Sequence, residues 1–355
     1  MPVPAQMTLG TGTLSIDESF TVNLEGEGAT ARLRGGVWRM LRRLSDRSTL
    51  FFANDTFLKL AGREDSVMTV RADRQGELTL GEDESYTLSV TEEGIRLAAV
   101  TDIGALRGLE TVLQLLTLHG DGITLPVVEI EDRPRFPWRG LMIDSSRHFM
   151  PVAMILRNLD GMAAVKLNVM HWHLVDDQGF RVESFSQPRL HELGSDGFYY
   201  TQEQIREVQS YAVERGIRVV PEFDLPGHGS AWLTAYPELA SAPGPYEIER
   251  SWGIFDPTVN PILEETYTFL DSFFEEMAAL FDDEFLHIGG DENNGEHWLA
   301  NPEIVAFMKE NGYKDPLALQ RYFNERVLEI LTRYGKRMVG WDEIFQEGLP
   351  KSIMI

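Results

Sequence analysis

Two adjacent acids, Asp291 and Glu292, follow the apolar pair Phe285-Leu286 and the segment His-Ile-Gly-Gly at 287–290. Successive side chains of a strand point to opposite faces, so both acids can serve one site only if the chain leaves the sheet here. The two glycines supply a backbone that permits this departure. The alternative is a solvated acidic loop after a buried strand. Residues elsewhere in the chain are needed to choose between this loop and a functional site.

Polar and aromatic side chains recur where other predicted strands end. They are Asp144 with Arg147 and His148, His171-Trp172-His173 with Asp176-Asp177, Glu222 and Asp224 with His228, and Trp341-Asp342-Glu343. A (β/α)8 barrel gathers all such strand ends around one mouth, whereas an open doubly wound sheet uses mainly its switch point. Functional-looking residues on five successive strand ends therefore favour the barrel.

The elements that must position these residues alternate between strand and helix after residue 138. Apolar runs predict strands at 139–144, 167–174, 217–223, 284–289, 337–341 and 352–355. Helices between them are indicated by two apolar faces, Ile155/Leu159/Met162 and Ile205/Val208/Ala212 with a stop at Gly216. A capping residue before proline predicts three more helix starts, at Asn260-Pro261, Asn301-Pro302 and Asp315-Pro316.

The first part of the chain predicts a small α+β domain. Its expected elements are strands at 13–24 and 67–73, helices at 37–48 and 103–118, and a hairpin at 86–100. The proline-containing stretch 131–138 reads as a boundary. The predicted organisation is thus an N-terminal α+β domain at 1–131 and a catalytic barrel at 132–355.

Composition excludes several classes of partner. The formal net charge of −24 argues against nucleic acid or an anionic membrane, while a neutral sugar is compatible with it. The chain has no cysteine, so disulfides and thiolate metal sites are ruled out. No segment approaches the length of a membrane span, and the start Met-Pro-Val-Pro-Ala-Gln shows no signal peptide. A soluble protein is expected; its compartment and oligomeric state are left open.

Carboxylates and tryptophans around a barrel mouth match the needs of glycoside hydrolysis: an acid for the leaving oxygen, aromatic faces for the ring and polar clamps for hydroxyls. Arg147 is suited to orient a polar ligand, and Trp341 to form an apolar wall for a sugar. His171, His173 and Asp176-Asp177 leave a metal site as an alternative. Because strand-end histidines more often hydrogen-bond neighbouring carboxylates, no metal and no cofactor are predicted.

Four ordered motifs resemble glycoside hydrolase family 20, the β-N-acetylhexosaminidases. They are Arg-Gly-Leu-Met-Ile-Asp-Ser-Ser-Arg-His-Phe at 139–149, Lys-Leu-Asn-Val-Met-His-Trp-His-Leu-Val-Asp-Asp at 166–177, Glu-Phe-Asp-Leu-Pro-Gly-His at 222–228, and His-Ile-Gly-Gly-Asp-Glu at 287–292. Residues 1–131 also look like the small domain that precedes this family's barrel. The resemblance implies an exo-acting hydrolase that removes terminal GlcNAc or GalNAc from β-linked glycans.

Carried over by position, the resemblance makes Glu292 the general acid and then base. Asp291 would orient the 2-acetamido group, whose carbonyl oxygen attacks the anomeric carbon and forms an oxazolinium ion. It further implies that Arg147 binds sugar hydroxyls and that Trp341 helps to cage the acetamido methyl. Asp176, His228 and His287 would be the network that supports the two acids.

One departure concerns the strand count. About six strands are visible where a barrel needs eight, so the barrel is expected to be truncated in this chain and the 355-residue piece to be poorly soluble or inactive. A non-catalytic carbohydrate-binding relative is therefore kept as the alternative, although Asp291 and Glu292 weigh against it. A family 18-type chitinase fits less well, because its run of spaced aspartates leading to a glutamate is not present.

Overall fold

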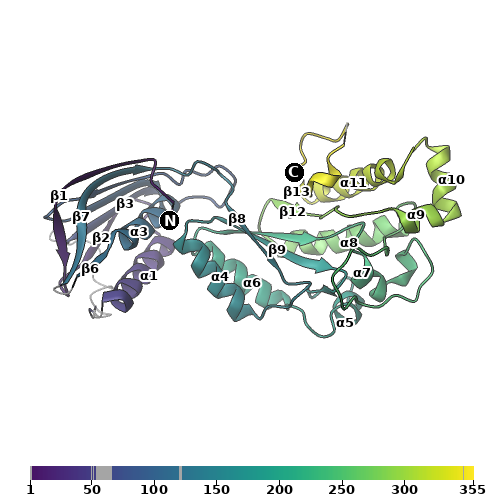
Figure 1. Ribbon diagram of the computed structural model, residues 1–355, viewed down its shortest axis with the longest axis horizontal. Coiled ribbons are helices and arrows are strands. Elements are labelled where there is room, and N and C mark those ends of the chain that lie inside the picture. Colours follow the sequence, from purple (N-terminus) through teal and green to yellow (C-terminus); the bar gives the residue numbers. More distant parts are fainter. Residues whose placement is uncertain (1, 49, 51, 53–65, 120–121, 347) are drawn as a thin grey trace. The chain divides into compact units, whose positions relative to one another are not determined.

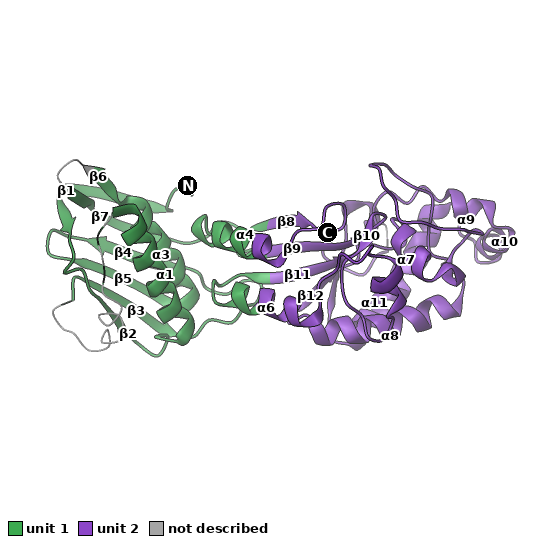
Figure 2. Ribbon diagram, turned by 90° about the horizontal axis from the view of Figure 1, so that it is seen from below, with its two compact units in different colours: residues 1–140, 156–169, 210–218 green, residues 141–155, 170–209, 219–355 purple. Residues whose placement is uncertain are grey.

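The computed structural model describes residues 2–48, 50, 52, 66–119, 122–346 and 348–355. The chain divides into two compact units (Figure 2). The first comprises 1–140, 156–169 and 210–218, and the second comprises 141–155, 170–209 and 219–355. Because each unit gathers separate stretches of chain, this division does not test the boundary expected at 131/132, which stays a prediction.

A seven-stranded sheet forms most of the first unit (Figure 1). Its strands are β1 (Gln6–Ile16), β2 (Val22–Glu25), β3 (Met68–Arg74), β4 (Tyr86–Val90), β5 (Ile95–Thr101), β6 (Thr117–His119) and β7 (Gly122–Asp132). Their order is β1-β7-β4-β5-β3-β2, with β6 paired to β7. The hairpin expected at 86–100 is confirmed as the antiparallel pair β4–β5.

In the described part of the first unit, α3 (Asp102–Leu115) packs against β3, β4, β5 and β7, and α1 (Ala31–Ser48) packs against α3. Helix α1 begins six residues before the predicted start, because the Thr30 hydroxyl accepts a hydrogen bond from the Leu33 N–H and caps it. The single strand expected at 13–24 is wrong, since β1 and β2 are separate strands. The helix expected at 103–118 ends at Leu115, where the chain pairs with β7 as β6.

Buried charges in the first unit are held in a closed network. Glu84 accepts hydrogen bonds from Arg107 Nε at 2.7 Å and from Arg139 Nη2 at 2.6 Å. Asn168 Nδ2 donates to the other oxygen of Glu84 at 2.8 Å. Although burial favours the neutral form, Arg107 and Arg139 lower the pKa of Glu84. The acid is therefore fixed as an anion between two cations.

The second sheet is built from short strands that alternate with helices. Its strands are β8 (Gly140–Asp144), β9 (Val169–Asp176), β10 (Gly179–Phe180), β11 (Arg218–Phe223), β12 (Phe285–His287) and β13 (Arg337–Val339). Their order is β10-β9-β11-β12-β13, with β8 paired to β9, and the pairs β11–β12 and β12–β13 are parallel. In the described part of the chain β8 and β13 are not paired, so this sheet is open.

Helices follow these strands as the sequence pattern predicts (Figure 1). They are α4 (Val152–Ala164), α5 (Arg189–Leu193), α6 (Gln202–Val213), α7 (Ser230–Ala235), η1 (Pro237–Leu239), α8 (Glu264–Leu280), α9 (Glu296–Ala300), α10 (Pro302–Glu310), α11 (Pro316–Arg333) and η2 (Asp342–Ile344). The apolar faces predicted for α4 and α6 are buried. No helix in the described residues is long and apolar enough to cross a membrane.

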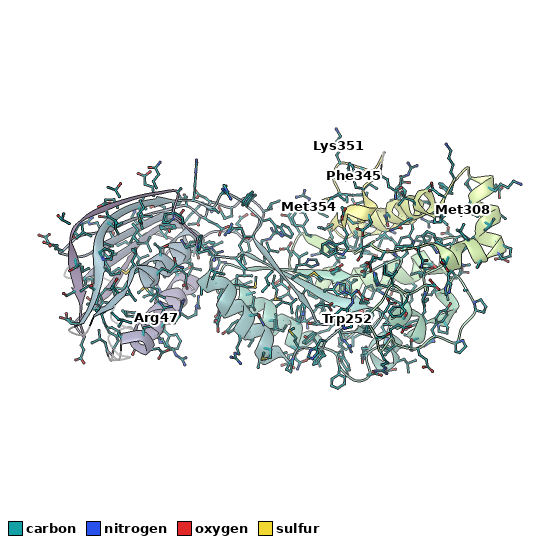
Figure 3. The ribbon with its side chains drawn as sticks, viewed as in Figure 1. Arg47, Trp252, Met308, Phe345, Lys351 and Met354 are labelled. Atoms are coloured by element: carbon teal, nitrogen blue, oxygen red, sulfur yellow. The ribbon has the colours of Figure 1, made fainter. Side chains whose placement is uncertain are left out.

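Two expectations for local structure are wrong. Helix α8 begins at Glu264 and not after Asn260. The side chain of Asn260 instead accepts a hydrogen bond from the Ile262 N–H. Asn301 and Asp315 do cap α10 and α11. The strand expected at 352–355 is only a single bridge from Met354, labelled in Figure 3, to Val339 of β13.

Candidate active site

The segment after β12 leaves the sheet, as the paired glycines predict. Strand β12 ends at His287, and Gly289 and Gly290 adopt φ values of +68° and +89°. A side chain at Gly289 would place its Cβ 1.8 Å from Asp224 Oδ1, so no other residue fits there. Glu292 also has a positive φ, +50°, which is uncommon for a non-glycine residue. This path puts Asp291 and Glu292 beside one neighbour, His228.

His228 faces both acids with one edge of its ring. Its Nε2 lies 3.4 Å from Glu292 Oε2 and 3.7 Å from Asp291 Oδ2. The side chains of Asp291 and Glu292 are 20% and 42% exposed, whereas that of His228 is 2% exposed. The imidazole thus forms the buried floor beneath two carboxylates that remain open to solvent.

The other edge of His228 is held by two buried acids. Its Nδ1 lies 3.1 Å from Asp176 Oδ1 and 3.0 Å from Asp177 Oδ2. Burial opposes the charged imidazolium, but the hydrogen bonds to Asp176 and Asp177 outweigh it and raise the pKa of His228 to about 12. Asp177 is fixed in turn by the Ser230 N–H and hydroxyl. His228 is therefore a cation aimed at Asp291 and Glu292.

Arg147 lies beyond Asp176 at the other end of this chain of contacts. Its Nη2 pairs with Asp176 Oδ2 at 2.7 Å, and its Nη1 pairs with Asp144 Oδ2 at 3.2 Å. Burial disfavours the charge, but Asp176 and Asp144 raise the pKa of Arg147. The side chain of Arg147 is 18% exposed, so a polar ligand can reach it.

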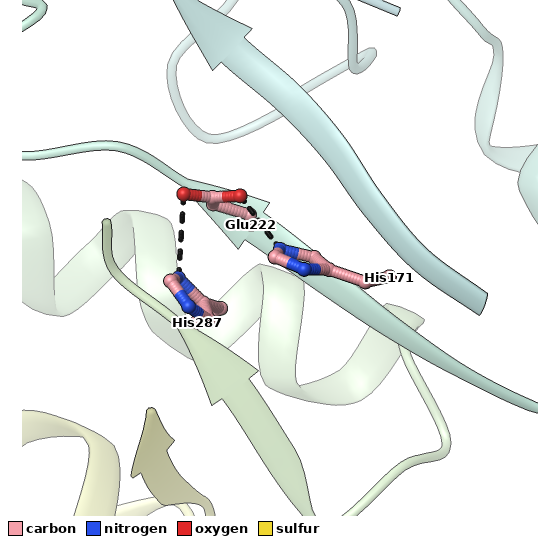
Figure 4. A group of neighbouring side chains, drawn as sticks. All are labelled: His171, Glu222 and His287. Carbon is pink, nitrogen blue, oxygen red and sulfur yellow. Dashed lines mark hydrogen bonds and ion pairs between the residues drawn. The ribbon is translucent and has the colours of Figure 1, made fainter. Parts of the chain in front are cut away.

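Glu222 on β11 is the centre of a second group of contacts (Figure 4). Its carboxylate lies 2.6 Å from His171 Nε2, 2.7 Å from His173 Nδ1 and 3.3 Å from His287 Nδ1. Trp341 Nε1–H donates to it at 2.9 Å. Burial favours the neutral acid, but the neighbouring histidines, His173 first, lower the pKa of Glu222 well below its usual range.

Two of the histidines around Glu222, His173 and His171, differ in charge. Burial opposes protonation of His173, but Glu222 and Asp176 on either side raise its pKa to about 10. Burial lowers the pKa of His171. His287 Nδ1 accepts a hydrogen bond from the Gly289 N–H at 3.0 Å, which places its own proton on Nε2 when the ring is neutral. The His173 cation therefore joins the Glu222 group to the Asp176 group.

Asp224 behaves differently from Glu222, although it lies only two residues further along the chain. Burial and the nearby Asp291 raise the pKa of Asp224 well above its usual range. Its Oδ1 accepts the Gly290 N–H at 3.0 Å, and its Oδ2 has no hydrogen-bond partner. Asp224 is thus a neutral acid beneath the glycine turn.

Several of these donors are close enough to hold a metal ion. The groups are His171/Glu222/His287, His173/Glu222/Asp224, Asp176/Asp177/His228 and Asp224/His228/Asp291. In the first group both Glu222 oxygens already contact protein donors, one of them the Trp341 N–H. The donor chemistry is compatible with zinc, so whether the protein uses a metal is a matter for experiment.

Two family models match this chain. Residues 136–355 match the model described as "Glycosyl hydrolase family 20, catalytic domain". Residues 1–115 match a model described as "beta-acetyl hexosaminidase like". The chain belongs to glycosyl hydrolase family 20.

Individual relatives of this family 20 chain extend the comparison. It is 45% identical to the beta-hexosaminidase subunit alpha of Bos taurus over 75% of this chain and 51% of that protein. It is 34% identical to the beta-hexosaminidase of Porphyromonas gingivalis over 100% of this chain and 46% of that protein. The chain therefore spans about half the length of these curated relatives.

Solved structures of family 20 proteins share the fold. The Flavobacterium johnsoniae chitobiase is 47% identical with a TM-score of 0.96, over 99% of this chain and 54% of that chain. The exo β-N-acetylglucosaminidase from Vibrio harveyi is 31% identical with a TM-score of 0.81, over 99% and 56%. An α/β fold with an N-terminal domain is thus established for this family member.

The seven residues to which the resemblance to family 20 assigns a role lie in one unit. Asp291, Glu292, His228, Asp176 and Arg147 form one chain of contacts, and His287 and Trp341 meet at Glu222. The sequence predicts Glu222 and Asp224 at strand ends without a role, and it suggests His173 and Asp177 only as the alternative metal ligands. Their signal was present, since each occupies a polar position in an apolar strand or directly after it.

Proposed function

We propose that this family 20 chain carries the catalytic residues of an exo-β-N-acetylhexosaminidase acting on terminal, β-linked GlcNAc or GalNAc. One observation carries the proposal: His228 binds Asp176 and Asp177 through Nδ1 and faces Asp291 and Glu292 through Nε2. Buried charge is thereby arranged behind two accessible acids, which is the arrangement that proton transfer to a leaving group needs.

Glu292 is assigned as the general acid and then base. As the acetamido carbonyl oxygen bonds to the anomeric carbon, the glycosidic bond breaks and the Glu292 proton moves to the leaving oxygen. The His228 cation, 3.4 Å away, stabilises the carboxylate that this transfer creates. Water then adds to the anomeric carbon as the bond between that carbon and the acetamido oxygen breaks, which restores the acetamide; the proton lost by the water returns to Glu292, and the configuration is retained.

Asp291 is assigned to the acetamido group. Its side chain is 20% exposed, and its Oδ1 has no hydrogen-bond partner in the protein, so the carboxylate keeps an unsatisfied acceptor that a substrate N–H can fill. A carboxylate at that point orients the amide and stabilises the positive charge of the oxazolinium ion. The protein then needs no nucleophile of its own.

The remaining positions are assigned to binding and support. Arg147 would bind sugar hydroxyls, and Asp176 and His287 would hold the charged groups in place. Trp341 would contact the acetamido methyl; its ring lies against the rings of His171 and His287, with centroids 5.5 and 4.8 Å away. Its N–H bond to Glu222 fixes the plane of that aromatic wall.

We infer further that the second sheet is part of a (β/α)8 barrel. The sheet order β8-β9-β11-β12-β13 follows the chain, with helices between strands, as in such barrels. The similar solved structures of family 20 extend over about twice this length. An α+β domain at 1–131 and a barrel domain from 132 remain our proposed organisation.

Hydrolysis of an aryl β-N-acetylglucosaminide by the longest form of the protein that the gene encodes tests the function. We expect turnover that persists after dialysis against a chelator, because Glu292 and the substrate amide supply the chemistry. Activity that a chelator abolishes and zinc restores would make His171 and its neighbours metal ligands and overturn the mechanism.

A further inference from the structure

A buried amide on helix α11 contacts both ends of the Asp291–Glu292 turn. Gln320 is 3% exposed. Its Nε2 donates to the Gly290 carbonyl oxygen at 2.6 Å, directly before the two acids. Its Oε1 accepts from Asn293 Nδ2 at 3.3 Å, directly after them. One side chain therefore brackets the pair.

The peptide groups of Gly290 are held from both sides. Asp224 Oδ1 accepts the Gly290 N–H at 3.0 Å, while Gln320 takes the carbonyl. Both Gly290 and Glu292 have positive φ values, +89° and +50°. Such conformations persist only where the surroundings fix them. Gln320 thus forms hydrogen bonds both to the residue before Asp291 and to the residue after Glu292.

We propose that Gln320 is a positioning residue that sets where the Asp291 and Glu292 carboxylates point. This inference rests on the proposed function of those two acids. An amide suits the task because it donates and accepts at once, whereas a leucine does neither and an ionised carboxylate only accepts. Reacting groups displaced by about 1 Å can cost ~10²-fold in rate, so a loose turn affects chemistry before binding.

The chain offers a matched control in Gln209 on α6. This glutamine is 5% exposed and also bridges two points of one loop. Its Nε2 donates to the Leu280 carbonyl at 2.9 Å, and its Oε1 accepts the Asp282 N–H at 2.9 Å. That loop precedes β12, whereas the catalytic turn follows it. Replacing either glutamine by leucine therefore removes two hydrogen bonds, but only Gln320 lies next to Asp291 and Glu292.

Gln320→Leu and Gln209→Leu are compared with wild type in melting temperature and in kcat and KM. Substrates with a poor and an activated leaving group are used. For Gln320→Leu we expect kcat on the poor leaving group to fall by about 10²-fold, with a smaller fall on the activated one and little change in KM. Gln209→Leu should have the same melting temperature as Gln320→Leu but keep the wild-type kcat on both substrates. Equal kcat for the two variants, or equal losses on both substrates, overturns the inference.

Gln320→Glu supplies a second test that does not depend on the leucine variant folding. A protonated carboxyl group can donate to the Gly290 carbonyl, but an ionised one cannot, and burial raises the pKa of the introduced acid. Activity should approach wild type at acid pH and fall as pH rises, relative to the wild-type profile. A profile parallel to wild type overturns the inference. Wild-type protein that hydrolyses neither substrate would instead overturn the proposed function.

Discussion

Two buried charge networks in this protein are built from similar residues but differ in completeness. In the first unit Glu84 is enclosed by Arg107, Arg139 and Asn168. Among the residues that the structure describes, none of those four contributes a buried polar side-chain atom without a hydrogen-bond partner. In the second unit such atoms occur beside Asp291 and Glu292, on Arg147, Asp224, His228 and Asp291 among others, and also away from these acids, on residues such as Gln178 and Asn324.

The difference teaches how to separate structural charge from functional charge. A buried polar group without a partner costs free energy, on the order of 1–3 kcal/mol, so folding alone favours closing every network. The open network surrounds the two accessible acids and the closed one does not. We therefore expect substitution of Glu84 in the closed network to change stability alone, and substitution of Glu292 beside the open network to change turnover.

The largest effect is expected at Glu292, which lies beside the second network. Glu292→Gln should lower kcat by about 10²–10⁴-fold on substrates with poor leaving groups, because general acid assistance is lost. An activated aryl substrate should lose much less, and the melting temperature should stay near wild type. A leaving-group series measured by steady-state kinetics decides this. Equal losses along the series would mean that Glu292 has another role.

The matching substitution in the closed network is Glu84→Gln. Removing this anion leaves the side chain of Arg107, 4% exposed, without its charged partner, and breaking such a pair costs about 3–5 kcal/mol. Urea denaturation should show this loss. The kcat per folded molecule should remain at the wild-type value. A fall in kcat as large as that of Glu292→Gln would show that the two networks do not differ in function.

A smaller effect is expected from His173, whose pKa is about 10 in the folded protein, against an ordinary value near 6.5. Its contribution to stability is fully present below about pH 6.5 and is lost as pH rises through 10. Between pH 7 and 9 the wild type should lose up to about 1.4 kcal/mol more per pH unit than His173→Gln. Denaturant titrations at these pH values give both slopes, and parallel slopes would show that His173 is neutral.

The smallest effect is expected at Asp224. Because burial and Asp291 raise the pKa of Asp224, a neutral amide imitates the neutral acid and can still accept the Gly290 N–H. Asp224→Asn should therefore change the free energy of unfolding by less than about 1 kcal/mol. The equivalent change at the ionised neighbour, Glu222→Gln, should cost several times more. Similar losses from the two would mean that both acids are charged.

Sequence patterns determined the elements wherever local signals were strong. The apolar faces of α4 and α6, the caps Asn301 and Asp315, and the departure at Gly289-Gly290 all follow from spacing and from backbone preference. Local signals failed at Asn260, which caps a short turn, and at 352–355, where pairing depends on a neighbouring strand. Strand pairing is decided by residues far apart in sequence, so these ends were not predictable.

By itself the sequence determined which residues could do chemistry, since motifs with Asp176, His228, Asp291 and Glu292 can be read along the chain. Only the tertiary structure decided their charges. Glu222 and Asp224 are acids two positions apart, yet histidines keep one ionised while burial beside Asp291 keeps the other neutral. Likewise Gln320 gives no sign of its contact with Gly290 until α11 packs against the turn. A pKa and a hydrogen bond depend on neighbours in space, and folding supplies those neighbours.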